Sequence, residues 1–165
     1  MVTFNLAYTA PINPSGASPV LTQAQVWEGL KIKVRAAQEF VPVITGCDVV
    51  SEETSPAGNL QVTRDVKFKP GGPSKTEARE VCVHYAPCRV VFEQEDGSTV
   101  TNVVSRDAGG NLMMSYVFEW RHPGMSEGSE EVAKLEEGHW KMAKMAVESS
   151  IDTIRRMVKE GRIKA

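Results

Sequence analysis

Residues 129–161, with the sequence SEEVAKLEEGHWKMAKMAVESSIDTIRRMVKEG, decide the fold of this chain. At about 100° of rotation per residue, their apolar side chains fall on one helical stripe, formed by Val132, Leu135, Ala143, Ala146, Ile154 and Met157. The polar residues His139 and Ser150 lie inside the same stripe. The spacing therefore predicts a long amphipathic helix that turns a titratable imidazole toward the protein interior.

The chain before this helix reads mainly as short strands. Residues 3–9 alternate between apolar and polar side chains. Residues 46–121 alternate in the same way between turn signals at 55–59, 70–73, 86–87, 96–97 and 109–111. Six strands fit between these turns, and residues 3–9 add a seventh. Because the connections are too short for crossover helices, the pattern predicts a mostly antiparallel sheet.

One or two short helices are expected after the first strand. Thr22 and Gln25 form a capping box, which marks a helix start. The apolar residues that continue from it at helical spacing are Val26, Trp27, Leu30 and Val34. Residues 39–44 are expected to add a second helical piece, whose length Pro42 limits.

This order of elements predicts an α+β fold in a single domain over residues 1–165. A seven-stranded antiparallel sheet must cover its apolar face, and a helix of about 30 residues is about 45 Å long, enough to cross it. Such a sheet twists and curves around the helix. We expect the curvature to leave a cavity between sheet and helix that suits a small molecule.

Charge and composition narrow the choice of partners. The formal net charge is −2, and the basic residues are scattered apart from a cluster at the C-terminal end. That cluster consists of Arg155, Arg156, Lys159, Arg162 and Lys164. Cations suit the negative end of a helix dipole, so the cluster does not require an anionic partner. We therefore expect no nucleic-acid partner, and the sequence leaves the oligomeric state open.

The termini and cysteines indicate a reducing compartment. The first residues lack the basic and apolar regions of a signal peptide, and no apolar run approaches about 18 residues. Cys47, Cys82 and Cys88 have spacings that fit neither a redox pair nor a zinc site. We expect free thiols in a cytoplasmic protein that does not insert into membranes.

An arginine lies on the apolar side of one predicted strand. On residues 61–69, Arg64 shares a face with Val62, Val66 and Phe68. A guanidinium keeps its charge, so a buried one requires an acidic partner or an anionic ligand. The alternative is a position at the cavity rim, with the head group in water.

Other inward faces follow from the same alternation. On residues 111–121 the inner set is Leu112, Met114, Tyr116, Phe118 and Trp120. Asn102 faces inward between Val100 and Val104, and Val90 and Phe92 also face inward. On residues 81–85 we expect Tyr85 inside and His84 outside. The side chains expected to line a ligand cavity are Trp27, Phe68, Tyr85, Met114, Phe118 and Trp120.

His139 is the best acid–base candidate, because an ordinary imidazole titrates near cellular pH. Arg64, Asn102 and Tyr116 complete the candidate catalytic set. Each residue also has a purely structural alternative. A histidine on a helix is often a hydrogen-bonded core residue, an amide often bonds the backbone of a β-bulge, and an aromatic stripe often only packs in the core. The sequence contains no nucleophilic triad order, phosphate loop, dinucleotide fingerprint or HExxH pattern, so neither a cofactor nor a metal is expected.

Four segments resemble a known family: residues 26–30 (VWEGL), 40–44 (FVPVI), 60–66 (LQVTRDV) and 127–129 (EGS). Together with the order of elements, they resemble the helix-grip fold of the SRPBCC superfamily, which includes START and birch-allergen proteins. The closer resemblance is to its AtaL-like branch, small fungal proteins often encoded beside secondary-metabolite pathways. The resemblance spans nearly the whole chain and implies a curved sheet gripping one long helix.

The resemblance also implies a function. The superfamily contains polyketide cyclases and aromatases, lipid carriers, hormone receptors and chaperone activators. We expect a cofactor-independent cyclase that acts on a polyketide-type secondary-metabolite intermediate, for example by lactonisation to a pyrone. The alternative is a carrier that binds an apolar metabolite or lipid without turning it over. A third reading, a protein-binding module, requires an exposed apolar patch instead of an interior one.

Overall fold

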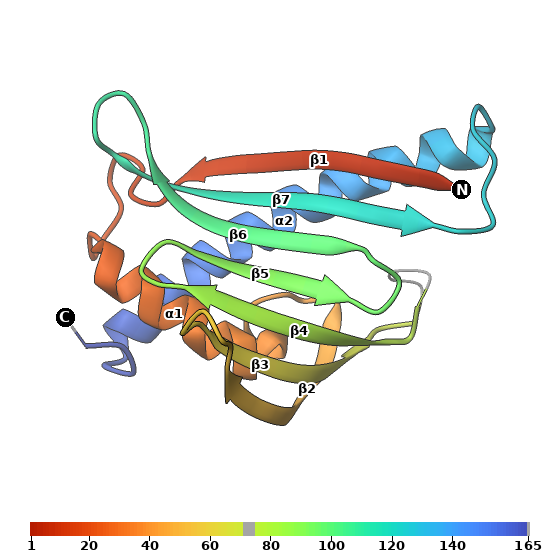
Figure 1. Ribbon diagram of the computed structural model, residues 1–165. Coiled ribbons are helices and arrows are strands. Elements are labelled where there is room, and N and C mark those ends of the chain that lie inside the picture. Colours follow the sequence, from red (N-terminus) through yellow and green to blue (C-terminus); the bar gives the residue numbers. More distant parts are fainter. Residues whose placement is uncertain (71–74, 165) are drawn as a thin grey trace.

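The computed structural model describes residues 1–70 and 75–164 of the chain. One antiparallel sheet of seven strands, in the order β1-β7-β6-β5-β4-β3-β2, carries the fold (Figure 1). The strands are β1 (Val2–Pro11), β2 (Ile44–Thr54), β3 (Leu60–Phe68), β4 (Glu77–Tyr85), β5 (Arg89–Gln94), β6 (Thr99–Arg106) and β7 (Leu112–His122). The predicted α+β class and the seven antiparallel strands are confirmed.

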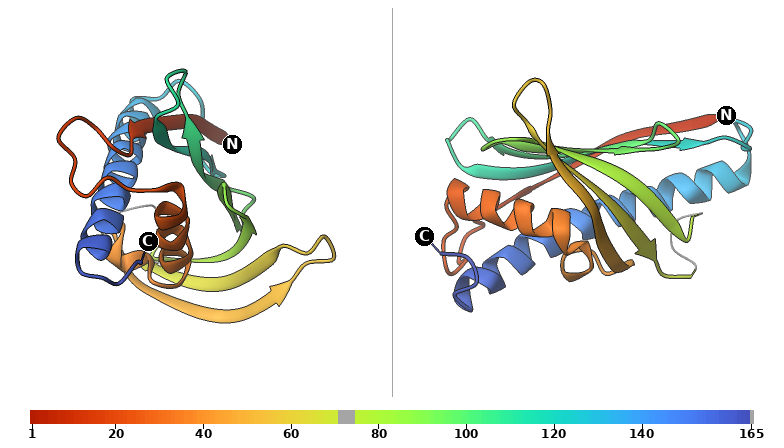
Figure 2. Two further views of the ribbon diagram at one scale, coloured as in Figure 1. Left: turned by 90° about the vertical axis from the view of Figure 1, so that its left-hand side faces the viewer. Right: turned by 60° about the horizontal axis from the view of Figure 1, so that its bottom comes forward.

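Strand β1 pairs with β7 although the two are far apart in sequence, with Phe4 opposite Trp120 and Tyr8 opposite Tyr116. Every other neighbouring pair is joined by a hairpin, as the short predicted turns require. The turn expected at residues 70–73 lies mostly outside the described residues. The sheet curves around the helices, which lie inside its bend (Figure 2).

The long helix α2 (Glu130–Lys159) begins where the sequence indicates. Ser129 caps its N-terminus by accepting a hydrogen bond from the Val132 backbone N–H, and Glu130 and Glu131 suit the positive end of its dipole. The stripe predicted from the spacing turns inward, since Ala143, Ala146, Ile154 and Met157 are buried together with His139 and Ser150. The helix therefore covers the concave face of the sheet.

Helix α1 (Gln23–Arg35) follows the first strand with the predicted capping box at Thr22 and Gln25. The expected helical piece over residues 39–44 is wrong in position. A 3₁₀ turn, η1 (Ala37–Glu39), precedes Pro42, and β2 already begins at Ile44. Proline disfavours helical backbone at the residue before it, so the helical segment ends early.

The inward faces of three strands are as predicted. Arg64 is buried on β3 between Val62 and Val66, Asn102 is buried on β6, and Tyr116 is buried on β7. The face predicted for residues 81–85 is wrong. Cys82 pairs with Val62 and Phe92, so Glu80, Cys82 and His84 turn inward and Tyr85 turns outward.

Candidate functional site

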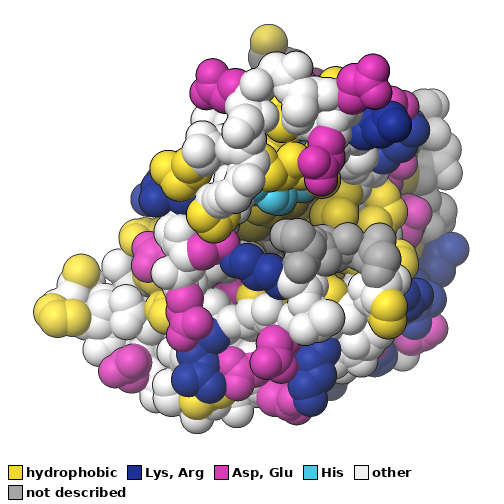
Figure 3. Space-filling model, turned by 90° about the vertical axis from the view of Figure 1, so that its right-hand side faces the viewer, with side chains coloured by type: hydrophobic (Ala, Val, Ile, Leu, Met, Phe, Trp, Pro, Cys, Tyr) yellow, Lys and Arg dark blue, Asp and Glu magenta, His cyan; other side chains and the backbone are white. Residues whose placement is uncertain are grey.

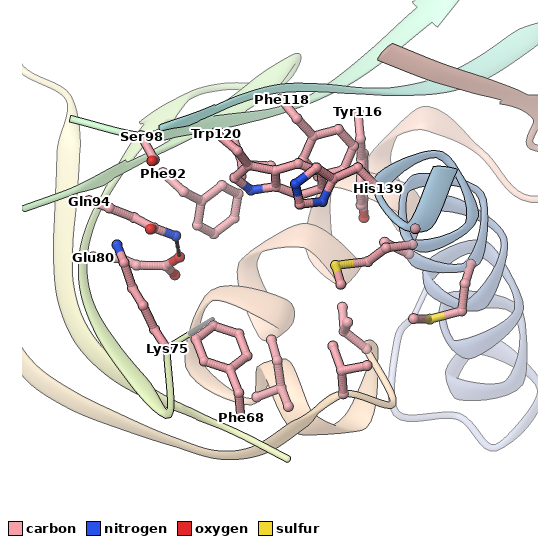
Figure 4. Close-up of a pocket in the computed structure, with 18 of the residues that line it drawn as sticks. Phe68, Lys75, Glu80, Phe92, Gln94, Ser98, Tyr116, Phe118, Trp120 and His139 are labelled. Atoms are coloured by element: carbon pink, nitrogen blue, oxygen red, sulfur yellow. Dashed lines mark hydrogen bonds between the residues drawn. The ribbon is translucent and has the colours of Figure 1, made fainter. Parts of the chain in front are cut away.

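A cavity of about 580 Å³ lies between the concave face of the sheet, α2 and the end of α1. The face shown in Figure 3 is hollowed, with hydrophobic side chains and a histidine visible inside the hollow. Phe118, Trp120 and His139 line one side of the cavity and Phe68 lies across from them (Figure 4). The other apolar walls come from Val41, Val43, Ile44, Phe92, Val100, Leu135, Met142, Met145 and Ala146.

Three buried polar side chains from three elements meet at one part of this cavity and form what we call the amine cluster: Lys33, Asn102 and Tyr116. The Lys33 Nζ donates to Asn102 Oδ1 at 2.7 Å and to the Tyr116 hydroxyl oxygen at 2.8 Å. Lys33 is only 5% exposed, and the other two are at most 1% exposed. The cluster is therefore shielded from solvent.

Burial governs the protonation of the amine cluster. Desolvation and the nearby positive charge of Arg64 hold the pKa of Lys33 well below its usual value, and Glu80 opposes this only in part. Burial also raises the pKa of Tyr116, so its hydroxyl keeps its proton. The cluster thus combines an amine that sheds its charge easily with a phenol that stays neutral.

Sequence reasoning missed Lys33, although a signal was present. Lys33 lies three residues after Leu30 and seven after Val26, on the apolar stripe of α1. A lysine on such a stripe is as unusual as Arg64 on its strand.

The acidic partner that Arg64 requires is Glu80 on the neighbouring strand β4. The Arg64 Nε and Nη2 donate to Glu80 Oε2 at 2.9 and 2.6 Å. The Arg64 Nη1 donates to the backbone carbonyls of Lys33 and Val34 at 3.0 and 2.9 Å. The guanidinium therefore binds the last turn of α1, whose carbonyls lack helical partners, and fixes the backbone of Lys33.

Glu80 is also held from the other side. Gln94 Nε2 donates to Glu80 Oε1 at 2.9 Å, and Figure 4 shows Gln94 directed at this carboxylate. Both carboxylate oxygens thus have donors. The Arg64–Glu80 pair is a satisfied structural pair at the cavity wall, and its contacts do not include the Lys33 amine.

His139 belongs to a different part of the cavity from Arg64. Its Nε2 lies 3.1 Å from the Nε2 of His122, so one ring donates and the other accepts. Its ring stacks on Trp120, with 4.2 Å between centroids, and meets the edge of Phe4. Burial, and then the neighbouring His122, lower the pKa of His139 to about 4. The imidazole is therefore neutral near pH 7 and can accept a proton, although as a weak base.

Three side chains predicted to line the cavity are not among its described lining residues: Trp27, Tyr85 and Met114. Trp27 packs edge-on against His84, at 6.1 Å between ring centroids. Tyr85 lies on the opposite face of the sheet, where the Arg89 guanidinium covers its ring. Met114 is fully buried in the hydrophobic core. The aromatic side chains Phe68, Phe118 and Trp120 do line the cavity, as expected.

In the described part of the chain, no helix combines the length and apolar character needed to cross a membrane. Residues 1–70 and 75–164 also contain no group of three or more His, Cys, Asp or Glu side chains arranged to hold a metal ion.

Solved structures resemble the whole fold. The solution structure of the KanY protein matches with a TM-score of 0.66 at 13% identity, covering 93% of this chain and 99% of that one. The crystal structure of the di-domain ARO/CYC BexL from the BE-7585A biosynthetic pathway matches with a TM-score of 0.60 at 16% identity. That match covers 93% of this chain and 49% of BexL, so the chain spans about half of the di-domain protein. At these identities the likeness shows the fold.

The sequence comparisons are more specific. A curated relative from Aspergillus terreus (strain NIH 2624 / FGSC A1156), acetylaranotin biosynthesis cluster protein L, is 27% identical over 159 residues. The alignment covers 96% of this chain and 92% of the relative. Residues 6–161 match the sequence model of the AtaL family, whose description is also acetylaranotin biosynthesis cluster protein L. Because that match spans nearly the whole chain, and the structure has the expected helix-grip fold, this protein belongs to the AtaL family.

Proposed function

We propose that this protein binds a secondary-metabolite intermediate in its cavity and catalyses a cyclisation that needs no cofactor. Pyrone-forming lactonisation of a polyketide-type chain is the specific reaction we propose. The AtaL family takes its description from a protein of a biosynthesis cluster, and this supports a role in secondary metabolism. The fold shared with the di-domain ARO/CYC protein BexL supports the reaction class. The free thiol of the exposed Cys88 fits the cytoplasm as its location.

The observation that carries the proposal is an unused donor on a side chain of the cavity wall. The Lys33 amine donates to Asn102 Oδ1, the oxygen of the side-chain amide. The Nδ2 of the same amide is buried and has no hydrogen-bond partner among the described residues. Leaving a buried donor unpaired costs about 1–3 kcal/mol, which a ligand oxygen would recover. An apolar cavity with one such donor suits an apolar ligand that carries a carbonyl group.

The proposed reaction uses these groups in sequence. A hydroxyl or enol oxygen of the ligand attacks a carboxyl carbonyl of the same chain, and the apolar walls hold the two ends together. Asn102 and Tyr116 donate hydrogen bonds to the oxygen that becomes negative. Neutral His139 accepts the proton of the attacking oxygen. The bond from the carbonyl carbon to the leaving group then breaks, His139 returns its proton to that group, and the group departs as water or a thiol as the lactone closes.

Arg64 has an indirect role in this scheme. Its guanidinium is engaged by Glu80 and by the backbone carbonyls of Lys33 and Val34. We therefore assign Arg64 as a positioning residue, which holds the end of α1 and with it the amine cluster.

The test begins with turnover. The purified protein is incubated with an extract from a host that lacks it, and bound and newly formed compounds are identified by mass spectrometry. Asn102→Leu removes the amide donor while keeping the side chain's size, and we expect it to lower kcat by about 10²–10³-fold. Cys88→Ser, at an exposed position, is the matched control and should leave kcat unchanged.

The carrier alternative makes a different prediction. A compound that co-purifies and returns chemically unchanged, with no new product from any fraction, would identify the protein as a carrier. Equal turnover by the Asn102→Leu variant and the unchanged protein would remove Asn102 from the reaction.

A further inference from the structure

The Lys33 amine has an unusual set of neighbours. Its two hydrogen-bond partners, Asn102 Oδ1 and the Tyr116 hydroxyl, are both uncharged. Among the described residues no carboxylate forms an ion pair with it. The Glu80 carboxylate, whose charge favours the charged amine, already accepts hydrogen bonds from Arg64 and Gln94. Neither hydrogen-bond partner carries the negative charge that would stabilise an ammonium.

A count of protons supports the neutral form. A neutral amine has two N–H groups and one lone pair, and the two acceptors use both N–H groups. An ammonium would have a third N–H, and this N–H has no hydrogen-bond partner among the described residues. The charged groups that bear on the amine are Arg64 from β3, which disfavours its charge, and Glu80 from β4, which favours it. The buried Cys82 thiol has its pKa raised to about 12, so it stays uncharged.

Two aromatic rings also lie near the amine. The Lys33 Nζ lies 4.0 Å from the centroid of the Tyr116 ring and 5.7 Å from that of Phe92. Ring faces attract a cation, whereas burial and the Arg64 charge lower the pKa of Lys33.

We infer that Lys33 is a nucleophile that condenses with a ketone or aldehyde carbonyl of the ligand to form an imine within the cavity. The lone pair of Nζ attacks the carbonyl carbon, and a carbinolamine forms. The C–O bond then breaks, and the oxygen leaves as water with the two protons that the amine carried. Tyr116, which keeps its proton and touches Nζ, relays a proton to the departing oxygen.

The substrate class that fits this chemistry is a 1,3-dicarbonyl or similar keto compound, a choice that rests on the proposed function. One carbonyl carbon bonds to Lys33. A second oxygen nearby accepts a hydrogen bond from the free Asn102 Nδ2. A carboxylate placed directly against the Lys33 amine would require a permanently charged partner there, so the group that meets Lys33 is a ketone or aldehyde carbonyl.

The test uses 1-phenylbutane-1,3-dione, an apolar diketone, with the full chain at pH 7. Condensation with an amine releases one water, and a proton shift then gives a conjugated enaminone without any reductant. We expect a new near-ultraviolet absorbance and a mass increase equal to one diketone minus one water. Peptide mapping should place the adduct on Lys33. An ordinary lysine has only about one amine in 2,000–3,000 neutral at this pH, so exposed lysines should react at least about 100-fold more slowly.

Lys31, two residues away on the same helix and more exposed, provides the matched control. Lys31→Met should keep the absorbance change, and Lys33→Met should lose it. If the second variant fails to fold, peptide mapping of the unchanged protein still identifies the reacting lysine. Absence of an adduct, or an adduct on exposed lysines only, would overturn the inference.

The outcome also separates this inference from the proposed function. An adduct on Lys33 without any product from host extract supports the amine and contradicts the cyclase. Product formation with no adduct contradicts the amine and leaves the cyclase standing.

Discussion

Lys33 and Arg64 are two buried cations whose partners differ for a chemical reason. An arginine cannot release its proton in a protein, so Arg64 is stable at 3% exposure only beside the Glu80 carboxylate. A lysine can release its proton, so Lys33 is stable between two neutral acceptors. The same burial thus produces a structural ion pair in one case and a reactive amine in the other.

A stability measurement tests the charge of Lys33 without any ligand. The folded state holds the pKa of Lys33 well below its usual value, whereas the unfolded chain keeps the amine protonated until about pH 10. The unfolded state therefore binds more protons, and the free energy of unfolding rises with pH. Relative to Lys33→Met, the unchanged protein should gain up to about 1.4 kcal/mol per pH unit between pH 7 and 9.

Urea unfolding at pH 7, 8 and 9 measures this gain. Taking the difference between the two proteins cancels the opposite effects of Tyr116 and Cys82, whose raised pKa values lower stability at alkaline pH. Parallel profiles for the two proteins would mean that Lys33 is charged in the folded state.

His139 gives the corresponding prediction at acidic pH. Its pKa is about 4 in the folded protein and about 6.5 in the unfolded chain, so the unfolded state binds more protons in between. Stability should therefore fall as the pH is lowered from about 6.5 to 4, by at most about 3 kcal/mol. His139→Phe keeps a ring against Trp120 and removes the titration, so its unfolding free energy should depend less steeply on pH in this range. An unchanged slope would contradict the buried neutral imidazole.

At the scale of the elements, the close crossing of α1 and α2 limits the size of the side chain at position 29. A Cβ built on Gly29 would lie 2.4 Å from Ile154 Cγ1 and 2.7 Å from its Cδ1. Ile154 is completely buried, so it has little room to move. The close approach of α1 and α2 therefore requires glycine at position 29. The glycine lets α1 pack directly against α2. The Arg64 guanidinium binds the last turn of α1, where Lys33 reaches the cavity.

Gly29→Ala tests this crossing. Alanine favours a helix over glycine by about 1 kcal/mol, but the clash with Ile154 should outweigh this and destabilise the protein by about 1–3 kcal/mol. Gly138→Ala on α2 is the matched control, since nothing lies within 4 Å of its added Cβ, and it should stabilise by up to about 1 kcal/mol. Thermal unfolding compares the two. Equal stabilisation by both substitutions would show that the helices can separate at no cost.

At the scale of the molecule, α2 makes the concave face of the sheet an interior. The helix contributes Ala143, Val147, Ile154 and Met157 to the core, and its N-terminal half contributes the cavity wall at His139 and Leu135. Without α2 the inner faces of β1 and β7 would be open to water. The cavity and the stability of the sheet therefore depend on the same helix.

Truncation after residue 128 should remove cooperative folding. The exposed concave face is apolar, so we expect a chain that aggregates or binds a hydrophobic dye strongly, with no sharp thermal transition. Circular dichroism and calorimetry measure the transition. A truncated protein that stays monomeric and melts cooperatively would contradict the role assigned to α2.

The sequence by itself determined the parts that depend on local periodicity. The apolar stripe of α2, the capping box at Thr22 and Gln25, and the alternation on β3, β6 and β7 each specify a face without reference to the rest of the chain. The direction predicted for β4 was wrong because Cys82 and Val83 are both buried. Apolar side chains therefore lie on both faces of this strand, and alternation alone does not distinguish them. There only the pairing with β3 and β5 decides the direction.

The chemistry of the site was decided by the tertiary structure alone. Lys33 meets Asn102 and Tyr116 across 69 and 83 residues of sequence, and Arg64 binds α1 across about 30. No local pattern encodes such meetings, because they follow from strand register and from the angle at which α1 crosses the sheet. The sequence therefore identified Arg64 and His139 as inward groups. Only the folded chain supplied Arg64 with a carboxylate, His139 with a second imidazole, and Lys33 with the neutral surroundings that make its amine reactive.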